Sequence, residues 1–261
     1  SVVDISGLNR ISERILSNAA GAIAGMANVT VSEGAEGRPL IGATMFGVTT
    51  PAVTEARKRL EELGYEVLVF HATGTGGQSM EALARGGYLA GVLDLTTTEL
   101  ADELVGGVLS AGPDRLEAAG AFGLPQVVSV GAVDMVNFGP RDTVPAKFAG
   151  RKLYQHNPTV TLMRTTPEEN AEIGRRIAAR AGASRGPLEV LLPLRGVSAY
   201  AKEGGPFHDP AADRSCIEAV KAGLGGKAKV REIDTDINDP QFARAAAEAL
   251  IAMMRSKTGR N

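Results

Sequence analysis

Apolar positions along this chain gather into short runs separated by longer, partly polar segments. Strand-like runs occur at residues 40–45, 65–70, 91–95, 125–131, 159–163, 188–194 and 230–236. Most of them are continuously apolar and do not alternate with polar residues, which is typical of strands buried on both faces in a parallel sheet. The runs therefore predict a mostly parallel sheet covered by helices.

The segments between these runs carry helical patterns. The clearest is residues 51–63, where Val53, Ala56, Leu60 and Leu63 fall on one face. Several helices begin with a threonine or aspartate followed by proline, a pairing that caps a helix and tolerates the missing proline N–H. Alternating strands and helices predict an α/β fold: a doubly wound, Rossmann-like sheet with helices on both faces.

The first thirty residues differ from the rest. A strand-like VVDI precedes a helix in which Leu8, Ile11, Ile15, Leu16 and Ala19 recur at helical spacing, and the linker-like SEGAEGRP follows. We expect residues 1–38 to be a helix and linker from a preceding, absent domain. Residues 39–261 are expected to form the α/β domain.

The composition of the chain excludes several kinds of binding partner and environment. The net charge is −2, aromatic residues make up 4% and tryptophan is absent, so nucleic acid is not an expected partner. No apolar run approaches the roughly 20 residues of a membrane span. A single cysteine, Cys216, allows no internal disulfide and fits a reducing compartment, so we expect a cytoplasmic protein.

Ligands of open parallel sheets bind beyond the carboxyl ends of the strands. The loops predicted there are rich in glycine and hydroxyl groups, which with helix N-termini suit a phosphate or carboxylate. A small anionic molecule is therefore the expected partner. Its predicted contacts in these loops are Thr49, Thr50, Thr73, Gly74, Thr75, Gly76, Gly77 and Thr97.

The glycine segment HATGTGG, residues 71–77, makes the strongest case among these loops. It lacks the lysine of a P-loop, and Ser79 stands where a dinucleotide fingerprint has its third glycine. Two interpretations stay open: an anion cradle, or a tight turn with a capped helix. Thr96 and Glu99 have capping-box spacing, which predicts that they cap the following helix.

The loop at residues 192–213 is too long for an ordinary strand-to-helix connection and is a second candidate. Arg195, Ser198 and Lys202 could hold the anion, and His208 could exchange a proton near neutral pH. The structural alternative is that Asp209 caps a helix and Phe207 fills the core.

Candidate catalytic groups are few. His208 and His71 are the predicted proton-transfer residues, while Asp94 and Asp134 stand at or beyond strand ends as generic acids or bases. The histidines share no metal-ligand spacing, so no metal site is predicted. Cys216 lies on an apolar helix face and is expected in the core.

Three stretches carry a resemblance to a known family: residues 1–26, residues 41–83 with GVTTP and HATGTGG, and GGPFHDPAAD at residues 204–213. They resemble the second half of the bacterial relatives of the tomato mosaic virus resistance protein, in the TM-one-like ATP-binding family. The resemblance implies two α/β domains in tandem, an oligomer, and a reaction that is not established in bacteria. The plant member binds ATP and inhibits viral replication by binding the viral helicase.

The resemblance assigns the ATP signature mainly to the first domain, through a glycine-threonine-aspartate-lysine motif that this chain lacks. ATP is thus suggested as a cofactor only by the family. Two hypotheses follow: a small-molecule site with or without enzymatic turnover, or a non-catalytic interaction module acting with the absent domain or a protein partner.

Overall fold

The computed structural model describes residues 7–29 and 37–258, and the chain separates into two units, Ser1–Gly37 and Arg38–Asn261. The strand-like segment expected at residues 2–5 and most of the expected linker lie outside the described residues.

The first unit contains one helix, α1 (Arg10–Ala27), in its described part. Asn9 caps it, because its side chain accepts hydrogen bonds from the backbone N–H groups of Ile11 and Ser12. None of its residues is buried, and the side chains of Ile11, Ile15, Ile23 and Met26 are 60–70% exposed. The helix therefore leaves an apolar face uncovered within its own unit.

The second unit is built on a six-stranded sheet in which every pair of neighbours is parallel. The strands lie in the order β2 (Glu66–His71), β1 (Leu40–Met45), β3 (Gly91–Thr96), β4 (Gln126–Gly131), β8 (Leu188–Pro193) and β9 (Lys229–Ile233). The order reverses direction between β1 and β3, as in doubly wound folds.

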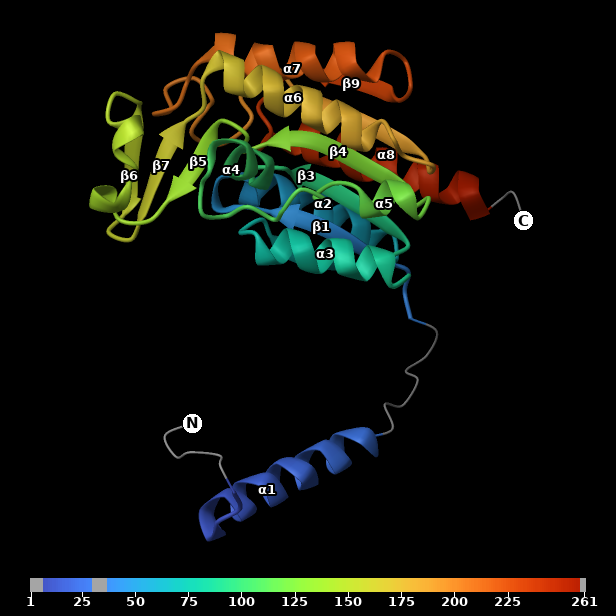
Figure 1. The fold of residues 1–261 in the computed structure, drawn as a ribbon. Coiled ribbons are helices and arrows are strands. Elements are labelled where there is room, and N and C mark those ends of the chain that lie inside the picture. Colours follow the sequence, from blue (N-terminus) through green and yellow to red (C-terminus); the bar gives the residue numbers. More distant parts are fainter. Residues whose placement is uncertain (1–6, 30–36, 259–261) are drawn as a thin grey trace. The chain divides into compact units, whose positions relative to one another are not determined.

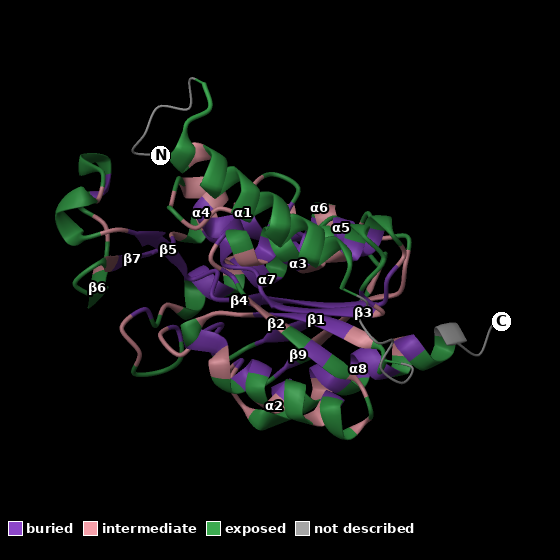
Figure 2. Cartoon of the chain, turned by 90° about the horizontal axis from the view of Figure 1, so that it is seen from below, coloured by how far each residue is buried: buried purple, intermediate pink, exposed green. Residues whose placement is uncertain are grey.

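Helices cover both faces of this sheet (Figure 2). One layer consists of α2 (Thr50–Glu62) and α8 (Pro240–Thr258), which pack on each other and on the strands. The other layer contains α3 (Thr75–Arg85), α4 (Glu99–Val105), α5 (Ala118–Ala121), α6 (Pro167–Ala181) and α7 (Pro210–Leu224). The predicted doubly wound α/β fold is confirmed.

A second, antiparallel sheet lies beyond the carboxyl ends of the parallel strands (Figure 1). Its strand order is β5 (Met135–Phe138), β7 (Val160–Arg164) and β6 (Leu153–Asn157), and short 3-10 helices at Arg141–Thr143 and Ala146–Phe148 lie between β5 and β6. Residues 159–163 were expected among the parallel strands, which is wrong: β7 is as buried as a central strand but pairs only with β5 and β6.

The first residues of three helices show how each helix begins and place Gly76 and Gly77 relative to α3. Thr166 and Asp209 cap α6 and α7 as predicted, and Thr166 forms its capping box with Glu169. Helix α3 begins at Thr75, within the glycine segment. Gly76 and Gly77 are therefore part of its first turn and not of a loop.

Among the described residues, no helix is both long enough and apolar enough to cross a membrane.

Candidate functional site

The N-terminus of α3 is an anion cradle, and the protein fills it with its own carboxylate. The backbone N–H groups of Gly74 and Gly77 donate to Oε1 of Glu99, at 2.7 and 3.1 Å. A carboxylate at a helix N-terminus is favoured by the free N–H groups and by the helix dipole. The anion that the glycine segment binds in this structure is therefore internal, and a ligand bound at this segment stays a prediction.

Arg115 neutralises this carboxylate from the other side. Its Nε donates to Glu99 Oε2 at 2.6 Å, and its two terminal nitrogens bind Asp94 at 2.5 and 2.7 Å. Glu81 lies 3.5 Å from the same guanidinium. All four side chains are almost completely buried, and burial raises the pKa of Glu81 and Glu99 although Arg115 opposes the shift. These four buried side chains form a charge cluster that is shielded from solvent.

The glycines are required by close packing in this region. A Cβ at Gly76 would lie 1.8 Å from the His71 carbonyl oxygen, and one at Gly77 would lie 2.2 Å from Glu99 Oε2. Gly74 has φ of +88°, a conformation that side chains disfavour. The segment leaves no room for a ligand between it and Glu99.

Two of the predicted ligand-binding threonines are buried with their hydroxyl groups bonded internally. Thr49 and Thr96 share a hydrogen bond of 2.8 Å between hydroxyls, and the Thr97 hydroxyl donates to the Ser129 carbonyl at 3.0 Å. The predicted capping box of Thr96 and Glu99 is wrong, because α4 begins at Glu99 without a side-chain cap and Glu99 reaches α3 instead.

The other predicted residues at this end are more accessible. Thr50 and Thr73 are half-buried, and their hydroxyls donate to the carbonyls of Phe46 and His71. His71 and Thr75 are exposed at the end of β2 and the start of α3.

The long loop after β8 is fixed from within. Ser198 is fully buried: its hydroxyl donates to Asp134 Oδ2 at 2.8 Å and accepts the N–H groups of Tyr200 and Ala201. Phe207 is also fully buried, as the structural alternative predicted. Both residues hold the loop against the domain.

The charged residues of this loop reach the surface. Arg195 is exposed and forms a paired contact with Asp234 at 2.6 and 2.7 Å, and Lys202 is exposed as well. His208 is exposed, and its Nδ1 lies 3.1 Å from the Ala201 carbonyl oxygen. A carbonyl can only accept, so Nδ1 carries the proton and Nε2 is the basic nitrogen of the neutral ring.

Open space gathers around the first turn of α7. A cavity of about 180 Å³ reaches from Arg195 and His208 to Asp213, and a second of about 270 Å³ reaches from Asp213 to Arg214 and Glu232. Both are lined by Leu194, Pro210 and Asp213, so they adjoin there. We call these two cavities together the α7 cleft.

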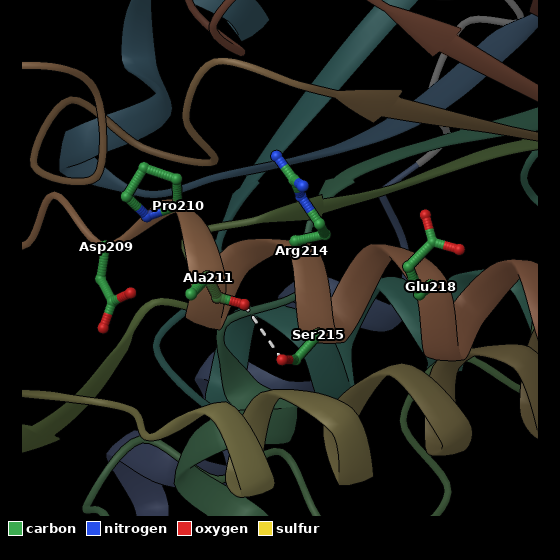
Figure 3. A pocket seen from close by; sticks show the side chains of 6 residues that line it. All are labelled: Asp209, Pro210, Ala211, Arg214, Ser215 and Glu218. Atoms are coloured by element: carbon green, nitrogen blue, oxygen red, sulfur yellow. Dashed lines mark hydrogen bonds between the residues drawn. The ribbon is translucent and has the colours of Figure 1, made fainter.

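A shallower hollow of about 670 Å³ lies along the same part of α7 (Figure 3). Arg214 and Glu218 project to the same side of the helix there, one turn apart. The GGPFHDP segment ends at Pro210, which lines this hollow and both cavities. The sequence motif and the open space thus coincide.

Asp213 occupies the junction of the two cavities. One of its oxygens accepts a hydrogen bond of 2.5 Å from Arg164 Nη2, and its side chain is 9% exposed. Burial raises the pKa of this carboxyl to about 7, Arg164 opposes the shift, and the nearby Asp134 adds to it. The carboxyl can therefore gain and lose a proton near neutral pH.

Arg164 ties β7 to the start of α7. Its Nε donates to the Phe207 carbonyl at 2.9 Å and its Nη2 to the Asp209 carbonyl at 3.2 Å. The sequence pattern did not single out Arg164, which lies 49 residues before Asp213 and on the second sheet. Within the described ranges, no three histidine, cysteine, aspartate or glutamate residues are grouped to hold a metal ion.

Comparison with known proteins places the chain in a family. Residues 38–254 match the C-terminal domain of the uncharacterised protein family UPF0261, and residues 1–32 match its N-terminal domain. The chain belongs to the UPF0261 family. The resemblance expected from GVTTP, HATGTGG and GGPFHDP is therefore confirmed.

Relatives from bacteria and from tomato cover almost all of this chain. It is 54% identical over 97% of its length to the UPF0261 protein of Clostridium tetani, and 55% identical over 95% to UPF0261 protein RA0729 of Rhizobium meliloti. It is 44% identical over 96% to the ToMV resistance protein Tm-1(GCR237) of Solanum lycopersicum. The chain spans 63% of the length of the two bacterial relatives and 34% of the tomato protein.

Among solved structures, a thioesterase domain from the curacin biosynthetic pathway aligns with 84% of this chain and 93% of its own length. The TM-score is 0.39 and the sequence identity 11%, which is too distant for any inference about function.

Proposed function

We propose that the α7 cleft binds a small molecule with a phosphate or carboxylate group, and that Asp213 exchanges a proton with it. The observation that carries the proposal is the position of Asp213. Its carboxyl opens onto two adjoining cavities, and the bond to Arg164 fixes its orientation. A carboxyl with a pKa of about 7 in a cleft suits general acid–base chemistry.

The surroundings of Asp213 supply the complementary charges. Arg195 and Arg214 line the cleft on either side of it, beside three glutamate residues (Glu203, Glu218 and Glu232), and α7 directs its N-terminus there. The two arginines and the helix N-terminus are the groups that would hold the anionic end of a ligand. His208 Nε2 offers a second proton acceptor in the smaller cavity, so Asp213 and His208 form an acid–base pair.

The size of the cleft favours a small metabolite. The two adjoining cavities measure about 180 and 270 Å³, so the cleft as a whole lies at the lower end of the roughly 300–1,000 Å³ of small-molecule pockets. ATP remains an inference from the family alone.

The test is a thermal-shift screen of the chain against sugar phosphates, small carboxylates and nucleotides, because a ligand that binds only the folded state raises the melting temperature. We expect a ligand whose shift is lost in Arg214→Ala and retained in Asp213→Asn. The control is Thr75→Ala at the start of α3. A shift that survives Arg214→Ala but is lost in Thr75→Ala contradicts the proposal.

A second candidate function is supported by α1. Its apolar side chains are exposed within its unit, and residues 1–32 match the N-terminal domain of the family. We propose that α1 packs against the rest of that domain, so that the chain acts together with it as part of a two-domain protein. Exposed apolar stripes of this kind mark interaction surfaces.

This candidate is tested by mixing the chain with the N-terminal domain of the Clostridium tetani relative and measuring complex formation. Ile15→Asp is expected to abolish the complex, and Glu13→Gln on the same helix to leave it intact. Self-association of the chain, lost in Ile15→Asp, would instead identify a homo-oligomer.

A further inference from the structure

We propose that Asp134 is a positioning residue of the α7 cleft, because it holds both walls of the cleft and sets the charge behind Asp213. This inference rests on the function proposed for the cleft. Asp134 lies between β4 and β5 and lines neither cavity, so it acts only through other residues.

The first wall is the loop that carries His208. The Asp134 carboxylate accepts the Ser198 hydroxyl at 2.8 Å, and that hydroxyl in turn accepts the N–H groups of Tyr200 and Ala201 at 3.0 Å. The Ala201 carbonyl then fixes Nδ1 of His208 at 3.1 Å. The orientation of the His208 ring is thus linked to Asp134 through Ser198 and Ala201.

The second wall is the start of α7. The backbone carbonyl of Asp134 accepts from Arg164 Nη1 at 3.4 Å and from the N–H of Thr165 at 3.1 Å. The Nη2 group of the same arginine binds Asp213. Displacement of Asp134 would therefore move the arginine that orients the Asp213 carboxyl.

The side chain of Asp134 adds an electrostatic effect. It is fully buried, and its Oδ1 has no hydrogen-bond partner in the described part of the chain. Its charge, like that of Asp209, raises the pKa of Asp213, while Arg164 lowers it. Arg195, Arg214 and His208 line the same cleft, and so do the acidic residues Glu203, Glu218 and Glu232.

The pKa of Asp134 is itself raised by its surroundings. Burial raises its pKa to about 6, and Arg164 and the Ser198 hydroxyl oppose the shift. A charged Asp134 favours the protonated form of the Asp213 carboxyl near neutral pH. Without that charge, Asp213 would release its proton at lower pH and would be a poorer proton donor at neutral pH.

The experiment is a titration of the Asp213 carboxyl by ¹³C NMR in the complete chain and in Asp134→Asn. We expect the midpoint of Asp213 to fall by roughly one pH unit in the variant, the size typical of a nearby like charge. The matched control is Asp102→Asn, which removes another buried carboxyl, bonded to Asn137 and not to Arg164 or Ser198. Its Asp213 midpoint should stay unchanged.

Ser198→Ala serves as the second variant, and it suffices if Asp134→Asn does not fold. It keeps the carboxyl but removes the hydroxyl that stabilises its charge, so the midpoint of Asp213 should fall by a smaller amount. An unchanged midpoint in the folded variants, or an equal fall in Asp102→Asn, would overturn the assignment. Because the titration needs no ligand, its outcome does not depend on whether the thermal-shift screen for the proposed function finds one.

Discussion

The starts of α3 and α7 contain similar groups in two different states. Each follows a strand of the same parallel sheet, and each has a buried arginine bound to a carboxylate: Arg115 to Glu99 near α3, and Arg164 to Asp213 in α7. Near α3 the carboxylate accepts from two backbone N–H groups and fills the helix N-terminus. In α7 the carboxyl opens onto two cavities.

The difference teaches that an anion cradle and a ligand site are separate properties. Glycines and a helix N-terminus create the cradle, but the rest of the chain decides whether the cradle stays open. At α3 the internal carboxylate makes the region part of the stability of the domain. At α7 a half-protonated carboxyl faces open space, so this region is expected to carry the chemistry.

The largest effect expected from this comparison is at Gly76. In Gly76→Val the side chain would overlap the carbonyl of His71, so we expect a loss of roughly 4 kcal/mol or more in the free energy of unfolding, or no folded protein. Urea denaturation followed by circular dichroism measures it. Gly47→Ala is the control, because a Cβ there meets no atom within 4 Å. Near-normal stability of Gly76→Val would refute the closed arrangement at α3.

A smaller loss is expected when the internal anion is neutralised. Glu99→Gln removes a buried partner of Arg115 and should cost about 3 kcal/mol of unfolding free energy at pH 7. Asp213→Asn should cost less, because burial raises the pKa of the Asp213 carboxyl to about 7 and the amide therefore replaces a group that is partly neutral at that pH. Equal losses in the two variants, measured by chemical denaturation, would remove the distinction between the two regions.

Three buried carboxyls contribute to the pH dependence of stability, in addition to Glu81 and Glu99. Burial raises the folded-state pKa of Asp102 and Asp213 to about 7 and that of Asp134 to about 6, above the ordinary value near 4. The unfolded chain binds fewer protons than the folded chain between those values, so stability falls as pH rises from about 5 to 8.

Asp102→Asn should reduce this fall by an amount on the order of 2 kcal/mol, because its carboxyl no longer titrates. Denaturation midpoints at pH 5 and pH 8 test the prediction. Stability that rises over this interval, or a fall that is the same in the variant, would contradict the raised pKa values.

The smallest effects on the fold are expected at the rim of the cleft. Arg195→Ala and Lys202→Ala should leave the melting temperature almost unchanged, because both side chains are exposed. Of these two residues, Arg195 lines the cleft and Lys202 does not. Arg195→Ala should therefore weaken ligand binding by roughly tenfold, whereas Lys202→Ala should leave it unchanged. Calorimetric titration with a ligand from the screen separates the two variants, and equal weakening would place the site elsewhere.

The sequence was sufficient for the central strands of the parallel sheet, because strands buried on both faces are continuous apolar runs, but the run at residues 159–163 belongs to the second sheet. It also marked both helix starts, through HATGTGG and GGPFHDP. It could not show that Glu99 fills the first of them, since that contact joins residues 22 and 25 positions apart. Arg164 was missed because it acts on α7 from the second sheet, whose strand β6 is polar and exposed and lacks an apolar pattern.

The most direct measurement of the central claim is an amide NMR titration of the chain with the strongest ligand from the thermal-shift screen. We expect the largest shifts at Ala201, His208, Asp213 and Arg214, which line the α7 cleft, and almost none at Gly74 and Gly77. Shifts centred on Gly74 and Gly77 would mean that the ligand displaces Glu99 from the start of α3, and would contradict the account.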